Sequence, residues 1–325
     1  MKKIILLVFG LILLGFPVYA QLLYRQYATQ KYMKGLLASN PAIEKTRSAI
    51  ERHTYDFGAY GRPDTVTIPV VIHLVGTASA AIAWEDVQAQ LNVLNKDFYQ
   101  PEYLSTETTH KAWKAEHFSG KAAKPFIRFC LAAQNPSGKM TPGVVYALSK
   151  VASFPVNDSI TTSEGGGSLA WNTANYLNIW VAPLEKNVAG FAQMPGGPVA
   201  SDGIVINTAF FARANQRAYI TANPAMANYA FGRTLSHLAG SYLGLYELWN
   251  DEVPCADDYV NDTPVHNAPN SGKPVYRHVS TCGNYPVEMT MNLMDNTDDE
   301  AQFMFTNGQM MRMYATLAPK GGPRA

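Results

Sequence analysis

The sequence predicts an α+β fold with two lobes around a cleft. Residues 65–246 mix apolar, β-rich runs with amphipathic helical patterns, which is typical of a sheet that packs against helices. Residues 250–290 are irregular instead, and rich in Asn, Asp, Pro and Gly. A chain of 325 residues is long enough to bury a large core between such lobes.

The first twenty residues have the pattern of a secretory signal peptide. Two lysines precede an apolar run at residues 4–16, and Val18 and Ala20 fit the small-residue pattern before a cleavage site. The apolar run is short for a transmembrane helix, although an uncleaved anchor is the alternative. We therefore expect a signal peptide at 1–20, a secreted or periplasmic protein, and no stable membrane span after cleavage.

Residues 21–64 are predicted to form a helical N-terminal segment. Apolar residues at helical spacing occur before Asn40, which is a good N-cap for a second helix that starts at Pro41. Glycines and a proline at 58–63 then mark a linker. One interpretation of this appendage is a pro-segment.

The main domain is expected at residues 65–318. The run TVTIPVVIHLV at 65–75 is apolar on both faces and predicts a central strand. Val87, Leu91, Leu94 and Phe98 fall at steps of four, three and four, which predicts an amphipathic helix. Further strands are predicted at 126–133, 143–148, 176–182 and 202–208. A last helix begins after Thr306, leaving a tail at 319–325. The upper lobe spans about 65–246 and the lower lobe about 247–318.

Residues 232–249, GRTLSHLAGSYLGLYELW, have the layout of the zinc-protease helix HExxHxxGxxH. In that motif two histidines four residues apart share one helix face and one metal, and the glutamate takes a proton from metal-bound water. A glycine then lets the chain leave the helix toward a third ligand. Here His237 holds the first ligand position and Gly244 the glycine position, within a helix predicted at about 225–246.

This helix resembles the pappalysin-type (M43, cytophagalysin) branch of the metzincin metalloproteases, whose pattern is close to GRTLTHEVGHYLGLYH. Residues 289–313, MTMNLMDNTDDEAQFMFTNGQMMRM, resemble the Met-turn segment of the same family, with Met294 at the Met-turn position. The likeness covers about residues 30–315. It implies a metzincin-like fold with an edge strand above the cleft that pairs with extended peptide. The residues near that position are Phe191, Ala192, Gln193 and Met194.

The departures from the family pattern fall on its chemistry. Leu238 replaces the general base, Ser241 the second histidine, and Glu247 the third. Asn296 stands where the family tends to have a tyrosine. A serine hydroxyl is a poor zinc ligand, and His237 with Glu247 makes two ligands where catalytic zinc sites use three. We therefore expect no intact catalytic residue and no zinc. Without a metal, His237 is expected to be a partly buried histidine that is hydrogen-bonded to a neighbour.

By the same reasoning Glu247 is expected to be solvated or ion-paired, and His73, in the first strand, to be a satisfied strand histidine. Asp257, Asp258 and Asp262 resemble a loop that holds calcium in some relatives, with Asp258 and Asp262 as the candidate ligands. The alternative is that these residues form turns and satisfy their own backbone.

Three cysteines remain after the signal segment. Secretion makes a disulfide plausible and leaves one cysteine over. The family often carries a bridge of similar span in its lower lobe, which implies pairing of Cys255 with Cys282. Cys130 lies in an apolar strand context and is expected to be a buried free thiol.

The leading hypothesis is a secreted, catalytically inactive pappalysin-like protein that binds a peptide or protein partner in its former active-site cleft. One alternative is an active zinc metalloendopeptidase with a non-standard metal site. Another is a non-enzymatic surface or matrix protein. A formal net charge of +1 and the lack of basic clusters argue against nucleic acid as a partner.

Overall fold

The computed structural model describes residues 25–57, 65–77, 81–99, 118–123, 127–185, 187–318 and 322–324. The predicted signal peptide at 1–20, the linker at 58–64 and residues 319–321 and 325 of the predicted tail lie outside these ranges. Within the ranges, no helix has both the length and the apolar character needed to cross a membrane.

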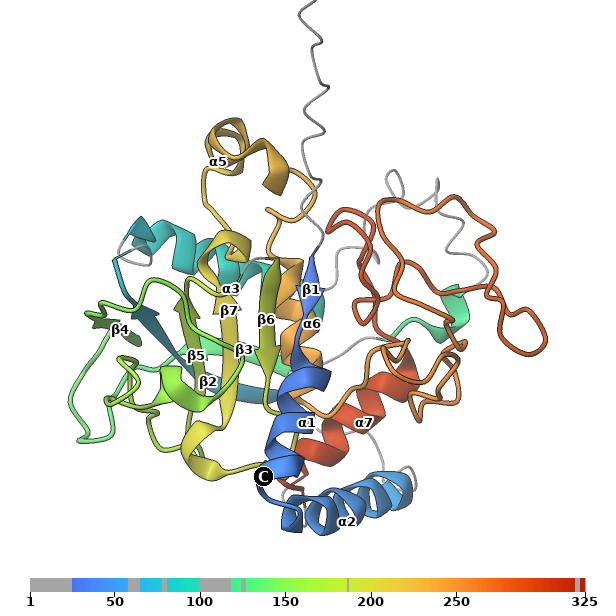
Figure 1. Ribbon diagram of the computed structural model, residues 1–325, viewed down its shortest axis with the longest axis horizontal. Coiled ribbons are helices and arrows are strands. Elements are labelled where there is room, and N and C mark those ends of the chain that lie inside the picture. The colour runs from blue at the N-terminus through green and yellow to red at the C-terminus, as the bar shows by residue number, and fades with distance from the viewer. Residues whose placement is uncertain are drawn as a thin grey trace, which may run out of the picture.

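A mixed sheet forms the centre of the upper lobe (Figure 1). Its strand order is β1-β6-β7-β5-β2-β3, and β4 pairs with the second half of β2. The β6–β7 pair is antiparallel and the other pairs are parallel. The strands are β1 (Gln26–Tyr27), β2 (Val66–Val75), β3 (Ile127–Leu131), β4 (Val144–Ala147), β5 (Leu177–Ala182), β6 (Val188–Ala192) and β7 (Gly203–Asn207).

The predicted strands are confirmed by this arrangement, since β2 pairs with three other strands and is buried over its last six residues. Two pieces were not predicted as strands of the sheet. The first is the start of β6, at residues 188–190, since its last two residues, Phe191 and Ala192, belong to the edge strand expected above the cleft. The second is β1, a two-residue strand from the N-terminal segment, which pairs with the outer edge of β6.

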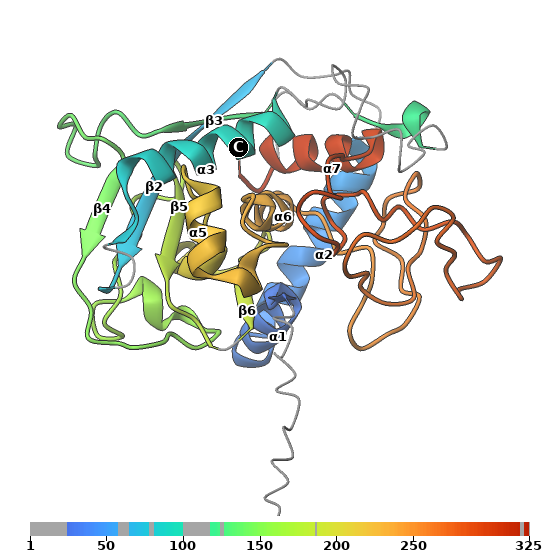
Figure 2. The same cartoon turned by 90° about the horizontal axis from the view of Figure 1, so that it is seen from above.

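Helices cover both faces of the sheet. The six α-helices in the described ranges are α1 (Thr29–Ser39), α2 (Ala42–Phe57), α3 (Trp84–Phe98), α5 (Gln216–Ala222), α6 (Arg233–Tyr242) and α7 (Asn307–Leu317). Figure 2 shows α3 and α6 side by side next to the sheet, and their apolar residues share one core with the Met-turn segment. Helix α1 packs on the other face, where Tyr32, Met33 and Leu36 meet Trp180 and Phe191. The α+β fold is therefore confirmed.

Helix α6, the helix of the motif, is shorter at its start than predicted. It begins at Arg233, because Gly232 takes a left-handed conformation with φ of 86°, and residues 224–226 form only a 3₁₀ turn. A side chain on Gly232 would also bring its Cβ to 2.9 Å from the Cβ of Ala212. The helix ends before Gly244, whose φ of 92° is the positive value expected of a helix-stop glycine.

The lower lobe is irregular apart from α7, as predicted. Thr306 caps α7 because its hydroxyl accepts a hydrogen bond from the backbone N–H of Gln309, and the Gln309 side chain accepts one from the backbone N–H of Thr306. Cys255 and Cys282 form the expected disulfide. Cys130 is free but half-buried rather than buried, because β3 lies at the edge of the sheet.

The tail is partly docked at the end of the motif helix. Arg324 donates from Nε to the carbonyl of Tyr242 at 2.9 Å and from Nη2 to that of Gln193 at 2.8 Å. It also pairs with Asp202. These contacts join the end of the chain to α6 and to the residue that follows β6.

Candidate functional site

Buried polar contacts fix the start of the motif helix. The Nε of Arg233 donates to both carboxylate oxygens of Asp97, at the end of α3, at 3.0 Å each. Asp299, from the Met-turn segment, accepts through Oδ2 from the backbone N–H groups of Phe231 at 3.1 Å and Arg233 at 3.2 Å. A carboxylate at a helix N-terminus is favoured both by these free donors and by the helix dipole.

His237 is held in the orientation of a metal ligand. It is fully buried, and its Nδ1 lies 2.9 Å from the carbonyl of Leu293, so that Nδ1–H donates and Nε2 keeps its lone pair. Burial, and then the positive charge of Arg25, lower the pKa of the imidazole to about 3. His237 is therefore neutral. The prediction of a partly buried histidine with a neighbour was right about the hydrogen bond and wrong about the burial.

Leu238, which departs from the motif, and Gly240, which matches the family pattern, are both buried in close contacts of the core. Leu238 is fully buried in the core and packs against Gly190 of β6, where an added Cβ would lie 2.6 Å from its Cδ1. The lack of a side chain at Gly240 leaves room for Met294 of the Met-turn, since a Cβ at position 240 would lie 2.6 Å from the Met294 Sδ. The position of the general base thus serves packing, while Gly240 and Met294 keep the close contact that shapes the site.

His237, Ser241, one turn later in α6, and Glu247 each have a buried polar atom that lacks a hydrogen-bond partner among the described residues. These atoms are Ser241 Oγ, Glu247 Oε1 and His237 Nε2, and the last two lie 3.6 Å apart. The other carboxylate oxygen of Glu247 accepts a hydrogen bond from the Gln30 amide. Burial raises the pKa of the Glu247 carboxyl to about 8, so it carries a proton at neutral pH. Glu247 was expected to be solvated or ion-paired. It is buried instead, with Gln30 on one carboxyl oxygen and the neutral imidazole of His237 3.6 Å from the other.

This donor set does not match a catalytic zinc centre. Zinc sites of that kind use three ligands from the set of His, Cys, Asp and Glu, with an open fourth position. His237 and Glu247 supply two, and the third position is the hydroxyl of Ser241. Within the described ranges, no three residues of those four types come together as a metal-binding group.

The N-terminal segment fills the edge of the cleft above these residues. Strand β1 runs parallel to β6, with Gln26 N donating to Asn187 O at 3.0 Å and Ala28 N to Gly190 O at 2.9 Å. Of the residues expected to bind peptide, Phe191 and Ala192 lie in β6, and Gln193 and Met194 follow it. All four are buried. The pairing of β1 with β6 involves residues before Phe191, and the outer edge of β6 is occupied by the chain's own N-terminal segment.

Three side chains of this segment contact three of the candidate site residues, Asn296, His237 and Glu247. The Arg25 guanidinium donates to Asn296 Oδ1 at 3.1 Å and forms a fully buried ion pair with Asp299. The Tyr27 ring stacks on the His237 imidazole, with centroids 3.5 Å apart and planes 4° from parallel. Gln30 caps Glu247, as described above.

No local pattern in the sequence indicates these three contacts. Arg25, Tyr27 and Gln30 lie in the polar stretch RQYATQKYM, residues 25–33. This stretch leads into apolar residues at helical spacing and contains no cysteine. Contacts between residues separated by more than 200 positions depend on the tertiary fold and leave no local pattern.

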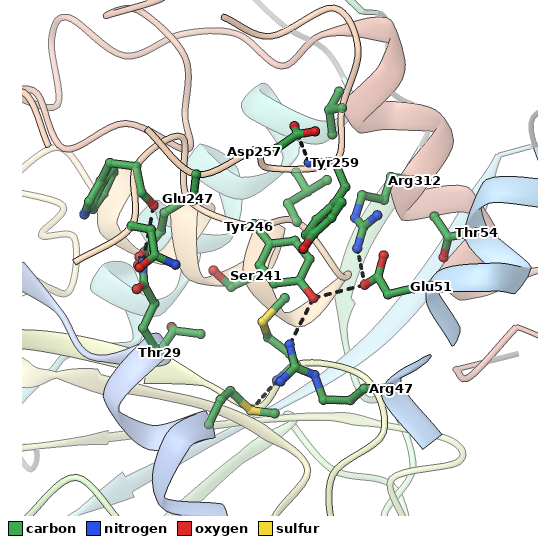
Figure 3. Close-up of a pocket in the computed structure, with 18 of the residues that line it drawn as sticks. Thr29, Arg47, Glu51, Thr54, Ser241, Tyr246, Glu247, Asp257, Tyr259 and Arg312 are labelled. Atoms are coloured by element: carbon green, nitrogen blue, oxygen red, sulfur yellow. Dashed lines mark hydrogen bonds and ion pairs between the residues drawn. The ribbon is translucent and has the colours of Figure 1, made fainter. Parts of the chain in front are cut away.

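A cavity of about 1510 Å³ lies beside the covered site, between α1, α2, α7 and residues 245–262. Figure 3 shows Ser241 and Glu247 on one side of it and a group of charged residues on the other. There Arg47 Nη2 donates to Tyr246 Oη at 2.9 Å, and Tyr246 donates to Glu51 at 3.1 Å. Glu51 also pairs with Arg312 of α7. The second N-terminal helix is thereby tied to the lower lobe.

The two candidate calcium ligands, Asp258 and Asp262, accept hydrogen bonds from other residues of the lower lobe. Asp258 accepts hydrogen bonds from the Thr263 hydroxyl at 2.8 Å and the Val260 backbone at 3.2 Å, and burial raises its pKa to about 7. Asp262 accepts from the Thr306 hydroxyl and from Gly308 N, at the start of α7. The contacts of Asp258 agree with the turn-forming alternative, whereas Asp262 binds the start of α7 from a distant part of the chain.

His73 also has the environment expected of a satisfied strand histidine. Its Nδ1 lies 2.8 Å from the Ser168 hydroxyl and its Nε2 lies 3.0 Å from Asn178 Oδ1. The imidazole stacks on Trp180, and burial lowers its pKa to about 4. Both nitrogens are engaged, so this histidine is part of the core.

Comparison with known sequences connects this geometry to metalloproteases. The family model for M43 peptidases, described as pregnancy-associated plasma protein-A, matches residues 162–318. An extracellular metalloprotease of Arthroderma benhamiae is 32% identical over 146 residues, which is 42% of this chain and 46% of that protein. The match thus spans about half the length of that relative. An extracellular metalloprotease of Arthroderma otae is 28% identical over 305 residues, 87% of this chain and 94% of that protein.

Solved structures of mirolysin from Tannerella forsythia are similar over most of the chain. Mature mirolysin in complex with a cleaved peptide is 32% identical, with a TM-score of 0.70, and the match covers 81% of this chain and 95% of that one. A promirolysin mutant is 29% identical, with a TM-score of 0.78 and coverage of 92% and 96%. The pro-form therefore matches a larger share of this chain than the mature form does.

Proposed function

The chain belongs to the M43 family of metalloproteases, and on that premise we propose that it is a secreted member that has lost proteolysis and kept a peptide-binding cleft. Secretion is supported by its relatives, which are named extracellular metalloproteases, and by the signal pattern of residues 1–20. The outcome of this loss is a binding protein built on a protease fold.

The observation that carries the proposal is the chemistry at the motif positions. Leu238 is packed into the core and has no group that accepts a proton, whereas a general base contributes roughly 10²–10⁴-fold to a rate. Zinc lowers the pKa of bound water from about 15.7 to about 7. A site with only two residues that can ligate zinc has one ligand fewer than catalytic zinc sites use.

Peptide binding in the cleft is supported by the strand arrangement. The outer edge of β6 pairs with an extended segment through main-chain hydrogen bonds, and such pairing requires no metal. Mature mirolysin, which shares this fold, is described in complex with a cleaved peptide. We infer that the edge of β6 is the peptide-binding element of this protein.

Metal analysis of the purified full chain tests the loss of the metal centre. We expect less than about one zinc per ten chains after equilibration with zinc and removal of loose metal, because a two-ligand site binds weakly. We also expect no cleavage of a peptide library. One tightly held zinc per chain, or cleavage that the His237→Ala change abolishes, would contradict the proposal.

Restoration of the motif gives a sharper test. The triple variant Leu238→Glu, Ser241→His and Glu247→His should bind one zinc and gain peptidase activity once the N-terminal segment is displaced. The matched control keeps Leu238 and carries only the two histidine changes. It should bind zinc without cleaving peptides, because it lacks the general base.

One observation favours a second candidate, an active metallopeptidase with a non-standard site. Buried polar atoms of His237, Ser241 and Glu247 lie without a hydrogen-bond partner within the described ranges, as ligand atoms around a metal do. The measurements above separate the two candidates. The third, a non-enzymatic surface or matrix protein, would be favoured if the protein binds neither zinc nor any peptide.

A further inference from the structure

The outer edge of β4 has no covering element among the described residues. Within those ranges β4 pairs with β2 alone. By contrast, the outer edge of β6 is occupied by β1, and on β3 the Asn95 side chain binds both backbone groups of Phe129 at 2.9 Å each. Figure 1 shows β4 at the outside of the sheet, on the side away from the lower lobe. An open strand edge is a template for pairing with another chain, and proteins usually protect it.

The backbone groups of β4 alternate between β2 and the outside of the sheet. The Gly143 carbonyl accepts a hydrogen bond from Ile72 N of β2 at 2.9 Å. Because successive residues of a strand direct their backbone groups to opposite edges, those of Val144 and Tyr146 point away from β2. None of these outward N–H and C=O groups has a hydrogen-bond partner within the described ranges. They are therefore available to an added strand.

Apolar side chains lie exposed beside these backbone groups. Tyr146 is 65% exposed, Leu148, directly after the strand, is 97% exposed, and Met140, before the strand, is 80% exposed. Tyr146 and Leu148 alternate with half-buried residues, so they share one face of the strand. When an extended segment pairs with an edge, its side chains lie over those of the edge strand. Such a segment would cover apolar surface that the protein itself leaves in water.

The charges of this border of the sheet are all positive. Residues 127–157 contain Arg128, Lys139 and Lys150 and no acidic residue. All three side chains are exposed, and no ion pair engages them among the described residues. A second copy of the chain paired at this edge would bring these like charges together, over a strand of four residues that offers little area. The charges therefore favour an acidic partner.

From these observations we propose that the edge of β4 binds an extended segment of a partner protein, in which alternating apolar residues are flanked by acidic ones. The segment adds a strand to the sheet through the outward groups of Val144 and Tyr146, and its acidic ends meet Lys139 and Lys150. Strands β4 and β6 lie toward opposite borders of the sheet. This surface is therefore separate from the cleft, and the proposal does not depend on whether the metal centre is lost.

The test uses the full-length chain and the fluorescent peptide fluorescein-EETVTVTEE-amide, with binding followed by fluorescence anisotropy at low ionic strength. We expect saturable binding that weakens at least about 10-fold when the glutamates are replaced by lysines, or when salt is raised to about 0.5 M. Two further peptides carry N-methyl groups on alternate amides, one set for each edge of the extended peptide. Only one set should abolish binding, because a strand added to β4 uses one of its two edges. Equal effects of the two sets would contradict strand addition.

Variants of the chain locate the binding. Tyr146→Pro removes an outward N–H and keeps the pairing with β2, since proline is tolerated where an edge strand faces outward, and it should weaken binding at least about 10-fold. Lys139→Glu combined with Lys150→Glu should reverse the preference, so that the lysine-flanked peptide binds better than the glutamate-flanked one. The matched control combines Lys45→Glu with Arg52→Glu, two exposed residues of α2 with the same change in net charge, and should behave as wild type.

An unchanged preference in the variant of Lys139 and Lys150 would overturn the proposal, and so would no binding by folded wild type. Hydrogen exchange on wild type decides the case if Tyr146→Pro does not fold. Bound peptide should slow exchange of the Val144 and Tyr146 amides at least about 10-fold, and protection at β6 instead would assign the peptide to the cleft and refute this site. Sedimentation of the free protein tests the other occupant. A dimer that Tyr146→Pro dissociates would show that the edge pairs with a second copy and would overturn the choice of an acidic partner.

Discussion

Replacement of Glu247 by glutamine should change how the stability of the protein depends on pH. Glu247 is 6% exposed, accepts a hydrogen bond from Gln30 and faces His237 across 3.6 Å. Burial raises its pKa from 4.5 to about 8. The folded protein therefore holds a proton on this carboxyl at pH values where the unfolded chain has released it.

The sign and size of the effect follow from this difference. Between about pH 4.5 and pH 8 the unfolded state binds one proton fewer, so the free energy of unfolding falls by about 1.4 kcal/mol for each pH unit. Across the whole window Glu247 removes about 5 kcal/mol of stability. Glutamine keeps the acceptor for Gln30 and does not titrate, and its amide N–H₂ can donate toward His237.

The assay is urea denaturation of wild type and Glu247→Gln from pH 4 to pH 9. The two should be of similar stability at pH 4, and the variant should be more stable by several kcal/mol at pH 9. Burial also raises the pKa values of Asp258 and Asp295 to about 7. Because these two carboxyls lower the stability of both proteins equally, the difference between the two stability curves reports Glu247 alone. The exposed Glu252→Gln change should alter the curve by less than about 1 kcal/mol. Parallel curves for wild type and Glu247→Gln would refute the buried, protonated carboxyl.

Two further predictions concern packing and the lower lobe. Gly240→Ala should destabilise the protein by about 1–3 kcal/mol, because its Cβ would lie 2.6 Å from Met294 Sδ. Gly35→Ala, in an exposed part of α1 with open space around it, should be neutral or slightly stabilising in the same denaturation experiment, and equal effects would contradict the close contact. Reduction of the Cys255–Cys282 bridge, which spans 27 positions, should lower stability by about 3 kcal/mol, and reductant should not affect a variant with both cysteines replaced by serine.

The fold was predictable because its signals are local. The run at 65–75 is apolar on both faces and becomes β2, which pairs with three strands. The spacing of Val87, Leu94 and Phe98 places them in the core, and Thr306 caps α7 as its residue type suggests. Where local signals compete, the prediction was less accurate, since the start of α6 depends on the left-handed conformation of Gly232 and the close approach of Ala212.

The site was predictable only in part. The motif placed His237, Ser241 and Glu247 together, because helix spacing and the glycine stop determine where those residues face. The motif could not show that Glu247 would be buried, since its burial comes from Gln30, 217 positions earlier in the chain. Nor could it show that Asn296 would bind Arg25, because an asparagine in a Met-turn segment carries no information about a partner in another segment.

The contacts of Asp299 indicate why the N-terminal segment should be regarded as part of the fold. One carboxylate oxygen of Asp299 pairs with Arg25, and the other accepts the N–H groups at the start of the motif helix. Departure of Arg25 would leave Asp299 buried beside Asn296 with unmet hydrogen bonds, and such a loss typically costs several kcal/mol. Separation of the segment therefore lowers the stability of the fold, so that docking of Arg25 and the stability of the motif helix are linked through Asp299.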